Sequence, residues 1–211
     1  NRKDRQDPRL FKIAEPVTDQ PAGVVSSYEG VDAGLNISDQ NNASPTASKI
    51  ARRYILDQVN EPMILLSYAE QEFLIAEGIA RTWVAGDAAT HYNNGITASM
   101  EFYQVDQSDI TTYLADPLVV YNAGNAIEMI ITQKYISFFL NSGWEPFFEH
   151  LRTGFPAFST GPGTRNDGQV PKRFQYPAAE YNYNKDNVEA AVQNQFGGDD
   201  NINGTMWVLQ D

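Results

Sequence analysis

The stretch from residue 63 to residue 103 constrains the fold most, because it reads as two amphipathic helices joined by a short turn. In its first half, apolar residues recur every three or four positions, which places them on one helical face. In the turn at residues 84–87, Gly86 can adopt a positive φ and Asp87 can cap the next helix. The residues of the two predicted faces are Leu66, Ala69, Phe73, Ala76, Ala80 and Trp83, and then Tyr92, Ile96, Met100 and Tyr103.

Two amphipathic helices with a short connection lie antiparallel and bury their apolar faces against each other. The spacing matches one tetratricopeptide-like unit of roughly 34 residues. Two more helices are predicted at about 125–141 and 145–152, and stacked hairpins would share one core. The sequence therefore predicts a mainly α fold of tetratricopeptide-like helical hairpins with irregular, loop-rich segments packed against them. The charged residues that we expect to face water on the first helix are Glu70, Glu72, Glu77 and Arg81.

The segments on either side of the hairpins carry weaker signals. Residues 10–13 alternate briefly and predict a short strand. Residues 20–48 are rich in Gly, Ser, Asn and Asp around a single aromatic residue, Tyr28, so this long connection is either functional or partly disordered. Beyond residue 154 the chain becomes irregular, with one last predicted helix at 184–195. A buried Trp207 is expected to fix the C-terminal segment.

Composition and motifs exclude several classes of protein. A net charge of -12 without a basic cluster argues against a nucleic-acid partner. The chain has no cysteine and no apolar run long enough to cross a membrane. His91 and His150 are the only histidines, and neither has the spacing of a metal-ligand pair. Nucleophile, phosphate-binding and dinucleotide-binding motifs are absent, so we expect no catalysis, metal or cofactor.

Two local patterns leave alternatives open. Residues 199–204 match the opening of a calcium loop, but its twelfth position is Gln210 instead of the bidentate glutamate, so a plain turn is favoured. Arg152 can either bind the last carbonyls of its helix or pair with Glu145. Gly154 is suited to the left-handed cap of the same helix. Both interpretations of Arg152 are structural.

Aromatic and amide side chains are the remaining candidates for ligand binding. The chain has 11 Tyr, 11 Phe and 3 Trp. Flat rings suit the apolar faces of sugars, while Asn, Asp and Gln suit their hydroxyl groups. The same composition also fits ordinary surface loops, so composition does not decide between a glycan site and a plain surface.

Short motifs recur in order along nearly the whole chain. They are Asp7-Pro8-Arg9-Leu10, Tyr28-Glu29-Gly30-Val31, Ile64-Leu65-Leu66-Ser67-Tyr68-Ala69-Glu70, Phe73-Leu74-Ile75-Ala76-Glu77, Tyr92-Asn93-Asn94-Gly95-Ile96, Ser99-Met100, Gln133-Lys134-Tyr135-Ile136, Arg152-Thr153-Gly154-Phe155-Pro156, Pro171-Lys172-Arg173-Phe174-Gln175-Tyr176-Pro177, Glu180, Asn184 and Met206-Trp207. In order and spacing, these motifs resemble the C-terminal half of the SusD/RagB-like family, the nutrient-binding lipoproteins of Bacteroidetes-type outer membranes. Two positions depart from the family pattern: Leu151 stands where a first Arg is common, and Val208 where a second Trp is common.

The resemblance implies that residues 1–211 are the C-terminal portion of one SusD-like domain. Residues 1–50 would be a loop-rich, ligand-side segment, residues 51–153 the helical hairpins and residues 154–211 an irregular C-terminal segment. We expect the start of the sequence to follow an absent N-terminal half that carries the signal peptide, the lipidated cysteine and further helical repeats.

The resemblance also implies a function without catalysis. The family holds oligosaccharides, or sometimes peptides, at the cell surface and passes them to a TonB-dependent, SusC-like transporter in the outer membrane. A tetratricopeptide-type scaffold that binds only another protein is the alternative. In this chain, we predict that Tyr28 stacks on the ligand from an exposed turn, and that Asp32, Asn36 and Asp39 bind its hydroxyl groups.

Overall fold

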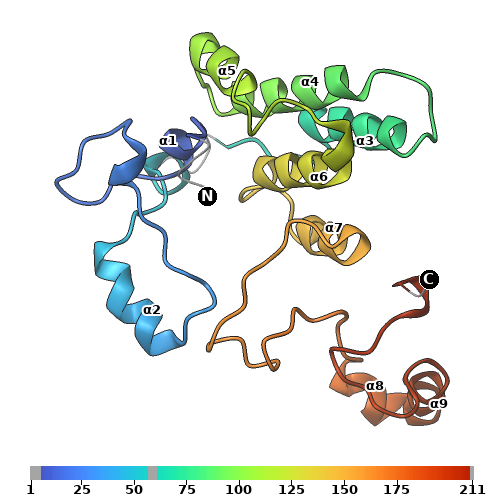
Figure 1. Ribbon diagram of the computed structural model, residues 1–211. Helices are drawn as coiled ribbons and strands as arrows, with labels where there is room; N and C mark the ends of the chain where they lie inside the picture. The colour runs from blue at the N-terminus through green and yellow to red at the C-terminus, as the bar shows by residue number, and fades with distance from the viewer. Residues whose placement is uncertain (1–5, 57–60, 210–211) are drawn as a thin grey trace. The chain divides into compact units, whose positions relative to one another are not determined.

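The computed structural model describes residues 6–56 and 61–209. All regular elements in these ranges are helical, and residues 14 and 50 form an isolated antiparallel bridge. The mainly α class is therefore confirmed (Figure 1). The α-helices are α1 (Leu10–Ile13), α2 (Ile37–Ala43), α3 (Tyr68–Ala80), α4 (Ala88–Phe102), α5 (Gln107–Leu114), α6 (Ala126–Ser137), α7 (Glu145–Thr153), α8 (Ala178–Tyr183) and α9 (Lys185–Phe196), and short 3-10 helices lie at Val25–Ser27, Ser44–Thr46, Arg52–Tyr54, Ala123–Asn125 and Trp207–Leu209.

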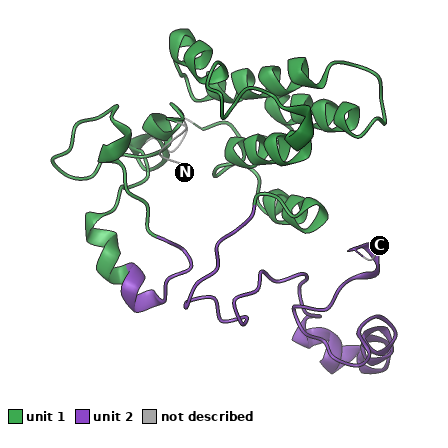
Figure 2. Ribbon diagram, in the orientation of Figure 1, with its two compact units in different colours: residues 1–31, 41–156 green, residues 32–40, 157–211 purple. Residues whose placement is uncertain are grey.

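The chain forms two compact units (Figure 2). The first contains residues 1–31 and 41–156, and the second contains residues 32–40 and 157–211. The helical hairpins all belong to the first unit, while α8, α9 and the long irregular segment before them belong to the second. No helix in the described part of the chain is long and apolar enough to span a membrane.

Helices α3 and α4 form the predicted hairpin, and their facing sides lie in the core of the first unit. Both N-termini are capped by side chains: Ser67 accepts a hydrogen bond from the Glu70 N–H, and Asp87, the predicted cap, accepts one from the Ala89 N–H. The two helices approach closely at Gly95, where a Cβ atom would lie 2.6 Å from the ring of Phe73. The buried apolar residues of this core are Ala69, Phe73, Ala76, Tyr92, Ile96, Met100, Tyr103, Val105, Ile110, Tyr113, Val119, Ala126 and Ile130.

Helix α6 packs against both α3 and α4, and α7 packs against α6. The third predicted helix is confirmed, although it ends at Ser137 instead of near residue 141. The fourth is confirmed at Glu145–Thr153, and Gly154 takes the predicted left-handed cap with a φ of +77°. The stacked arrangement of α3, α4, α6 and α7 is that of tetratricopeptide-like hairpins (Figure 1).

A buried arginine joins the N-terminal segment of the first unit to this core. Arg9 is 1% exposed and pairs with Asp7 at 2.7 Å. Its guanidinium also donates to Ser99 of α4 at 3.1 Å and to Gln133 of α6 at 2.7 Å. Gln133 in turn donates to the Tyr113 hydroxyl of α5 at 3.0 Å. A buried charge is tolerated only when it is paired and hydrogen-bonded, and this network meets both conditions.

A buried arginine, Arg173, holds the segments of the second unit together. Arg173 is 6% exposed, and its guanidinium lies 4.0 Å from the centroid of the Phe196 ring of α9. It donates to the carboxylate of Asp200, which also accepts hydrogen bonds from the Tyr176 N–H and the Tyr181 hydroxyl. Burial favours the neutral form of Asp200, but these donors outweigh it and hold its pKa below the usual value.

The prediction for the first apolar face is wrong at both ends, where Leu66 and Trp83 were expected to be buried. Leu66 precedes α3 and is 60% exposed, and Trp83 follows the helix and is 72% exposed. The left-handed residue of the α3–α4 turn is Thr82, with a φ of +62°, and not Gly86. Gly86 is needed for another reason, because a Cβ atom there would lie 2.6 Å from Ile79. Gly86 is therefore required because the turn packs closely against Ile79 of α3.

Two expectations for the loop-rich segments are also wrong. Residues 10–13 form the helix α1 instead of a strand. Residues 20–48, which are expected to be either functional or partly disordered, contain α2 and two 3-10 helices. Trp207 is 74% exposed, so it does not fix the C-terminal segment by burial.

Candidate functional site

Tyr28 does not present its ring on the surface, which corrects the prediction of an exposed stacking ring. It is 5% exposed, and its ring lies 5.4 Å from that of Phe11 on α1. The isolated appearance of Tyr28 in the sequence was misleading, because Phe11 reaches it across the fold. Its ring therefore packs within the first unit, against Phe11 of α1.

The other three predicted ligand residues, Asp32, Asn36 and Asp39, are exposed and belong to the second unit. Asp32 accepts a hydrogen bond from the Gly34 N–H at 2.8 Å. Asn36 accepts one from the Asp39 N–H at 2.9 Å and donates to the Asp39 carboxylate at 2.7 Å. These contacts form a tight turn followed by an N-cap for α2. The turn keeps three polar side chains on a short stretch of exposed backbone.

The turn is held by close backbone contacts with a second glycine-rich segment of the same unit. The Gly163 N–H donates to the Gly34 carbonyl at 2.8 Å. A Cβ atom on Gly161 would lie 2.5 Å from that carbonyl oxygen, and one on Gly163 would lie 2.1 Å from the Leu35 carbonyl oxygen. Side chains at either glycine would therefore displace the turn. We name residues 32–39 the polar turn.

A separate groove lies within the first unit, between the 23–26 segment and the end of α5. Its volume is about 900 Å³, which is within the range of small-molecule sites. Phe11 and Val25 supply apolar groups to its lining, and polar groups come from Ser26, Asp109 and Thr112. The α5 side of this groove was not predictable from the sequence, because the two segments are about 85 positions apart. We name it the α5 groove.

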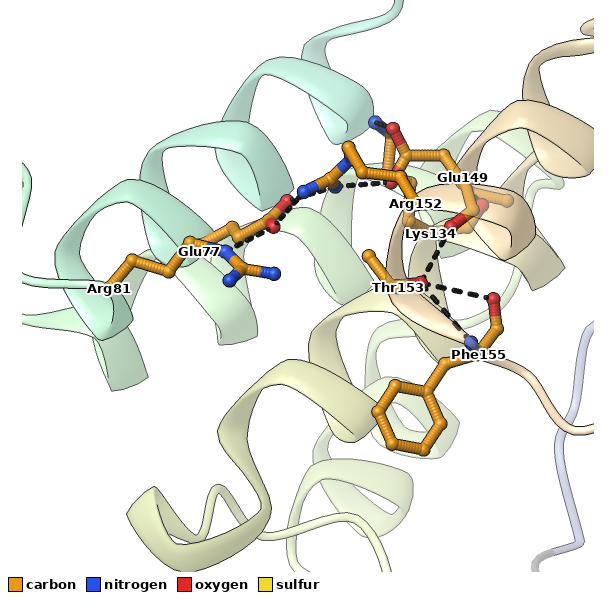
Figure 3. A network of polar contacts seen from close by, with 8 residues as sticks. Glu77, Arg81, Lys134, Glu149, Arg152, Thr153 and Phe155 are labelled. Carbon is orange, nitrogen blue, oxygen red and sulfur yellow. Dashed lines mark hydrogen bonds and ion pairs between the residues drawn. The ribbon is translucent and has the colours of Figure 1, made fainter. Parts of the chain in front are cut away.

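A network of ion pairs joins α3, α6 and α7 (Figure 3). Arg152 donates to both carboxylate oxygens of Glu77, at 2.6 and 2.8 Å, and to Glu149 at 2.7 Å. Arg81 donates to Glu77 at 2.7 Å, and Lys134 lies 3.4 Å from Glu149. Neither predicted interaction of Arg152, with Glu145 or with the final carbonyls, is found, because the carboxylate of Glu77 on α3 is within reach.

Glu72 and Glu77 correct the expectation that the acidic residues of α3 face water. Glu77 is 3% exposed; burial favours its neutral form, but hydrogen bonds from Arg152 and Arg81 hold its pKa below the usual value. Glu72 is 5% exposed and lies 2.7 Å from the Nδ1 atom of His91. Both carboxylates join helices to one another: Glu77 joins α3 to α7, and Glu72 joins α3 to α4.

The described residues contain no group of three or more His, Asp or Glu side chains that could hold a metal ion. In the calcium-like stretch, Asp200 is bound to Arg173 and Tyr181. Gln210, the twelfth position of that pattern, lies outside the described residues. His150 contacts the Pro156 carbonyl at 3.0 Å. Asp200 and His150 thus have hydrogen-bond partners within the protein.

Comparison with known proteins places the chain in a family. Residues 3–177 match the SusD-like family described as "starch-binding associating with outer membrane". A SusD homolog from Bacteroides fragilis is 35% identical with a TM-score of 0.88, and the match covers 99% of this chain and 50% of that one. A second SusD homolog from the same species is 31% identical with a TM-score of 0.90, over 99% of this chain and 50% of the other.

A third similar structure is that of a chitin-binding protein. It is 32% identical to this chain with a TM-score of 0.82, and the match covers 99% of this chain and 48% of that one. No curated protein matches the chain. The chain belongs to the SusD-like family, and it spans about half the length of the solved relatives that it matches.

Proposed function

We propose that the protein binds a nutrient glycan at the cell surface and delivers it to a TonB-dependent, SusC-like transporter of the outer membrane. The observation that carries this proposal is the family match over residues 3–177. A lipid anchor outside this chain holds the protein at the membrane. The protein is not an enzyme: it binds its ligand and releases it unchanged.

The polar turn supplies ligand contacts from this half of the protein. Asp32, Asn36 and Asp39 are exposed, and the carboxylates of Asp32 and Asp39 each have one oxygen that the local turn does not use. Both polar atoms of the Asn36 side chain are used in the turn, but its amide group has a second N–H. Carboxylates and amides at short spacing are suitable partners for the hydroxyl groups of a sugar. The turn is already formed by its own hydrogen bonds, so the cost of ordering it on binding is small.

The α5 groove is a second surface for the same class of ligand. The apolar part of the groove's lining, which includes Phe11, suits the C–H face of a sugar ring. The side chains of Asp109, Thr112 and Ser26 suit the hydroxyl groups of the sugar. A relative that binds chitin supports a glycan over a charged ligand. The acidic lining of the groove also disfavours anionic ligands, which it would repel.

Isothermal titration calorimetry on a protein of family length tests the proposal. The ligands are starch and chitin oligosaccharides, with mixed peptides as a comparison. We expect saturable heats with at least one oligosaccharide and no hydrolysis products after prolonged incubation. Binding of peptides alone would replace the glycan with a peptide nutrient. Binding of neither, together with capture of another protein by the helical hairpins, would favour a tetratricopeptide-type scaffold.

Single substitutions then assign the surface. Asp32→Ala should raise the dissociation constant by about ten- to a hundredfold if the polar turn binds the ligand. Asp109→Ala should raise it by about the same factor if the α5 groove binds the ligand. Asp106→Ala is the matched control, because Asp106 lies one turn from Asp109 and its side chain forms no cap hydrogen bond. If Asp32→Ala and Asp109→Ala both bind the ligand as tightly as the parent protein does, the ligand binds outside both surfaces.

A further inference from the structure

Two glycine-containing segments of the second unit meet backbone to backbone. The Gly163 N–H donates to the Gly34 carbonyl at 2.8 Å, and a Cβ atom on Gly34 would lie 2.9 Å from the Gly161 nitrogen. None of these three glycines has a positive φ, so the close approach of the two backbones, and not an unusual conformation, requires glycine here. We name residues 161–164 the glycine clasp.

At the start of the polar turn, the clasp is linked to a predicted ligand residue through Gly34 alone. The Gly34 N–H donates to the Asp32 carboxylate at 2.8 Å, while the Gly34 carbonyl accepts the hydrogen bond from Gly163. A Cβ atom on Gly161 would lie 2.5 Å from the same carbonyl oxygen, which is too close for two atoms that are not bonded. A side chain on the clasp would therefore displace Gly34 and move the Asp32 carboxylate that is bound to it.

Gly163 also reaches the other end of the turn. A Cβ atom on Gly163 would lie 2.1 Å from the Leu35 carbonyl oxygen and 2.9 Å from the Asn36 nitrogen. The same carbonyl oxygen accepts a hydrogen bond from the Gln40 side chain of α2 at 2.7 Å. Asn36 in turn binds Asp39 through two hydrogen bonds. Displacement of this peptide would therefore shift the other two ligand residues of the turn.

The clasp is anchored to the C-terminal part of the second unit. The Thr164 hydroxyl accepts a hydrogen bond from the Gly161 N–H at 3.2 Å, which closes the clasp on itself. Two positions further on, Asn166 and Asn203 exchange two amide hydrogen bonds, of 2.6 and 2.9 Å. These contacts tie the clasp to residues 199–204 and do not involve the polar turn. The clasp can therefore hold the turn in one conformation before a ligand arrives.

We propose that the glycine clasp positions Asp32, Asn36 and Asp39 for the ligand and thereby sets the affinity of the polar turn. Gly161 and Gly163 are positioning residues, because they act through the turn and need no contact with the ligand. A turn that is already held in its binding conformation loses less conformational entropy when the ligand binds. The inference rests on the proposed function of the polar turn, and it extends that function to residues about 125 positions further along the chain.

Calorimetry with starch and chitin oligosaccharides, on a protein of family length, tests the clasp. Gly163→Ala should raise the dissociation constant by about tenfold or more, because the added methyl group displaces the turn. Thr164→Val is a milder variant that removes the acceptor for the Gly161 N–H and keeps the size of the side chain. It should raise the dissociation constant by about two- to tenfold, which corresponds to one hydrogen bond.

Gly30→Ala is the matched control for Gly163→Ala. Gly30 lies two positions before the polar turn and has no positive φ, and a Cβ atom there would meet nothing within 4 Å. The dissociation constant of this variant should stay within about twofold of that of the parent. An increase equal to that of Gly163→Ala would overturn the proposal, because any added methyl group near the turn would then have the same effect.

A double variant separates positioning of the turn from a general loss of stability. If the clasp acts through the turn, Asp32→Ala combined with Gly163→Ala should bind about as weakly as the weaker of the two single variants, because both changes remove the same interaction. Effects that multiply would show that Gly163 acts elsewhere, and they would overturn the proposal. If Gly163→Ala does not fold, the same cycle with Thr164→Val decides the question.

The result for Asp32→Ala alone distinguishes a failure of this proposal from a failure of the proposed function on which it rests. Weak binding by Asp32→Ala, together with parent-like binding by Gly163→Ala and Thr164→Val, would overturn the role of the clasp and leave the polar turn as a ligand surface. Parent-like binding by Asp32→Ala would remove the polar turn from the ligand site, and the role of the clasp would be overturned with it.

Discussion

In the first unit, α3, α4 and α6 bury a continuous set of apolar side chains, whereas the second unit surrounds the guanidinium of Arg173 with Asp200 and Phe196. The second unit also buries Val188 and Val192, but its irregular segments supply few other apolar side chains. Apolar burial is insensitive to pH, while an ion pair is not. The two units should therefore respond differently to the truncation of an apolar side chain and to the removal of a charge.

The largest expected effect tests the apolar side of this comparison. Phe73 is fully buried, so Phe73→Ala should cost about 3–5 kcal/mol of stability through lost burial and the cavity left behind. Leu74→Ala is the matched control, because Leu74 is the next residue of α3 and its side chain is 44% exposed. This substitution should cost less than about 1 kcal/mol of stability. Urea unfolding measures both free energies. Similar costs would mean that α3 does not bury the predicted face.

Removal of the charge tests the other side. Arg173→Met leaves the Asp200 carboxylate without its cation and should cost about 3 kcal/mol in the second unit. Lys172→Met is the control at the adjacent, exposed position. Hydrogen exchange should accelerate in peptides from residues 157–209 and stay unchanged in peptides from α3 and α4. Acceleration in both sets would show that the two units unfold as one.

Acid should affect the carboxylates whose pKa is held low in the folded state. Glu77 and Asp200 both have lowered pKa values, so they stabilise the fold fully above their unfolded-state pKa. This contribution is lost as the pH falls through the folded-state pKa. Stability measured from pH 6 to pH 2 should decline in the acidic part of this range. Asp200→Asn should flatten the decline measured in the second unit, and an unchanged slope would contradict the assignment.

The smallest expected effect concerns Trp207. Its side chain is 74% exposed, so Trp207→Ala should change stability by less than about 0.5 kcal/mol. The melting temperature of the variant should match that of the parent. A loss of more than about 2 kcal/mol would restore the original expectation that this residue holds the C-terminal segment by burial.

The fold was predictable where the signal is local. Periodic apolar residues and capping residues such as Asp87 and Gly154 predicted α3, α4 and α7, because these features act within a few positions of each other. The pairing of Glu77 with Arg152 was not predictable, since 75 positions separate them. An acidic residue on a helix reads as solvent-facing until its cation is placed beside it.

The candidate site was less predictable for the same reason. The burial of Tyr28 depends on Phe11, whose helix carries no strong signal in the sequence. The α5 groove depends on the approach of two segments that are distant in the chain. In contrast, the exposed side chains of Asp32, Asn36 and Asp39 agree with the polar composition of their segment. Their binding of a ligand stays a prediction.

The contact between Gly95 and Phe73 has a consequence for how such sequences can vary. A glycine within a helix costs about 1 kcal/mol relative to alanine, and here the close approach of α3 and α4 offsets that cost. A larger residue at position 95 would meet the Phe73 ring, so it requires a smaller side chain at position 73. Across related sequences, these two positions should therefore change together: glycine with a large ring, or alanine with a smaller aliphatic residue.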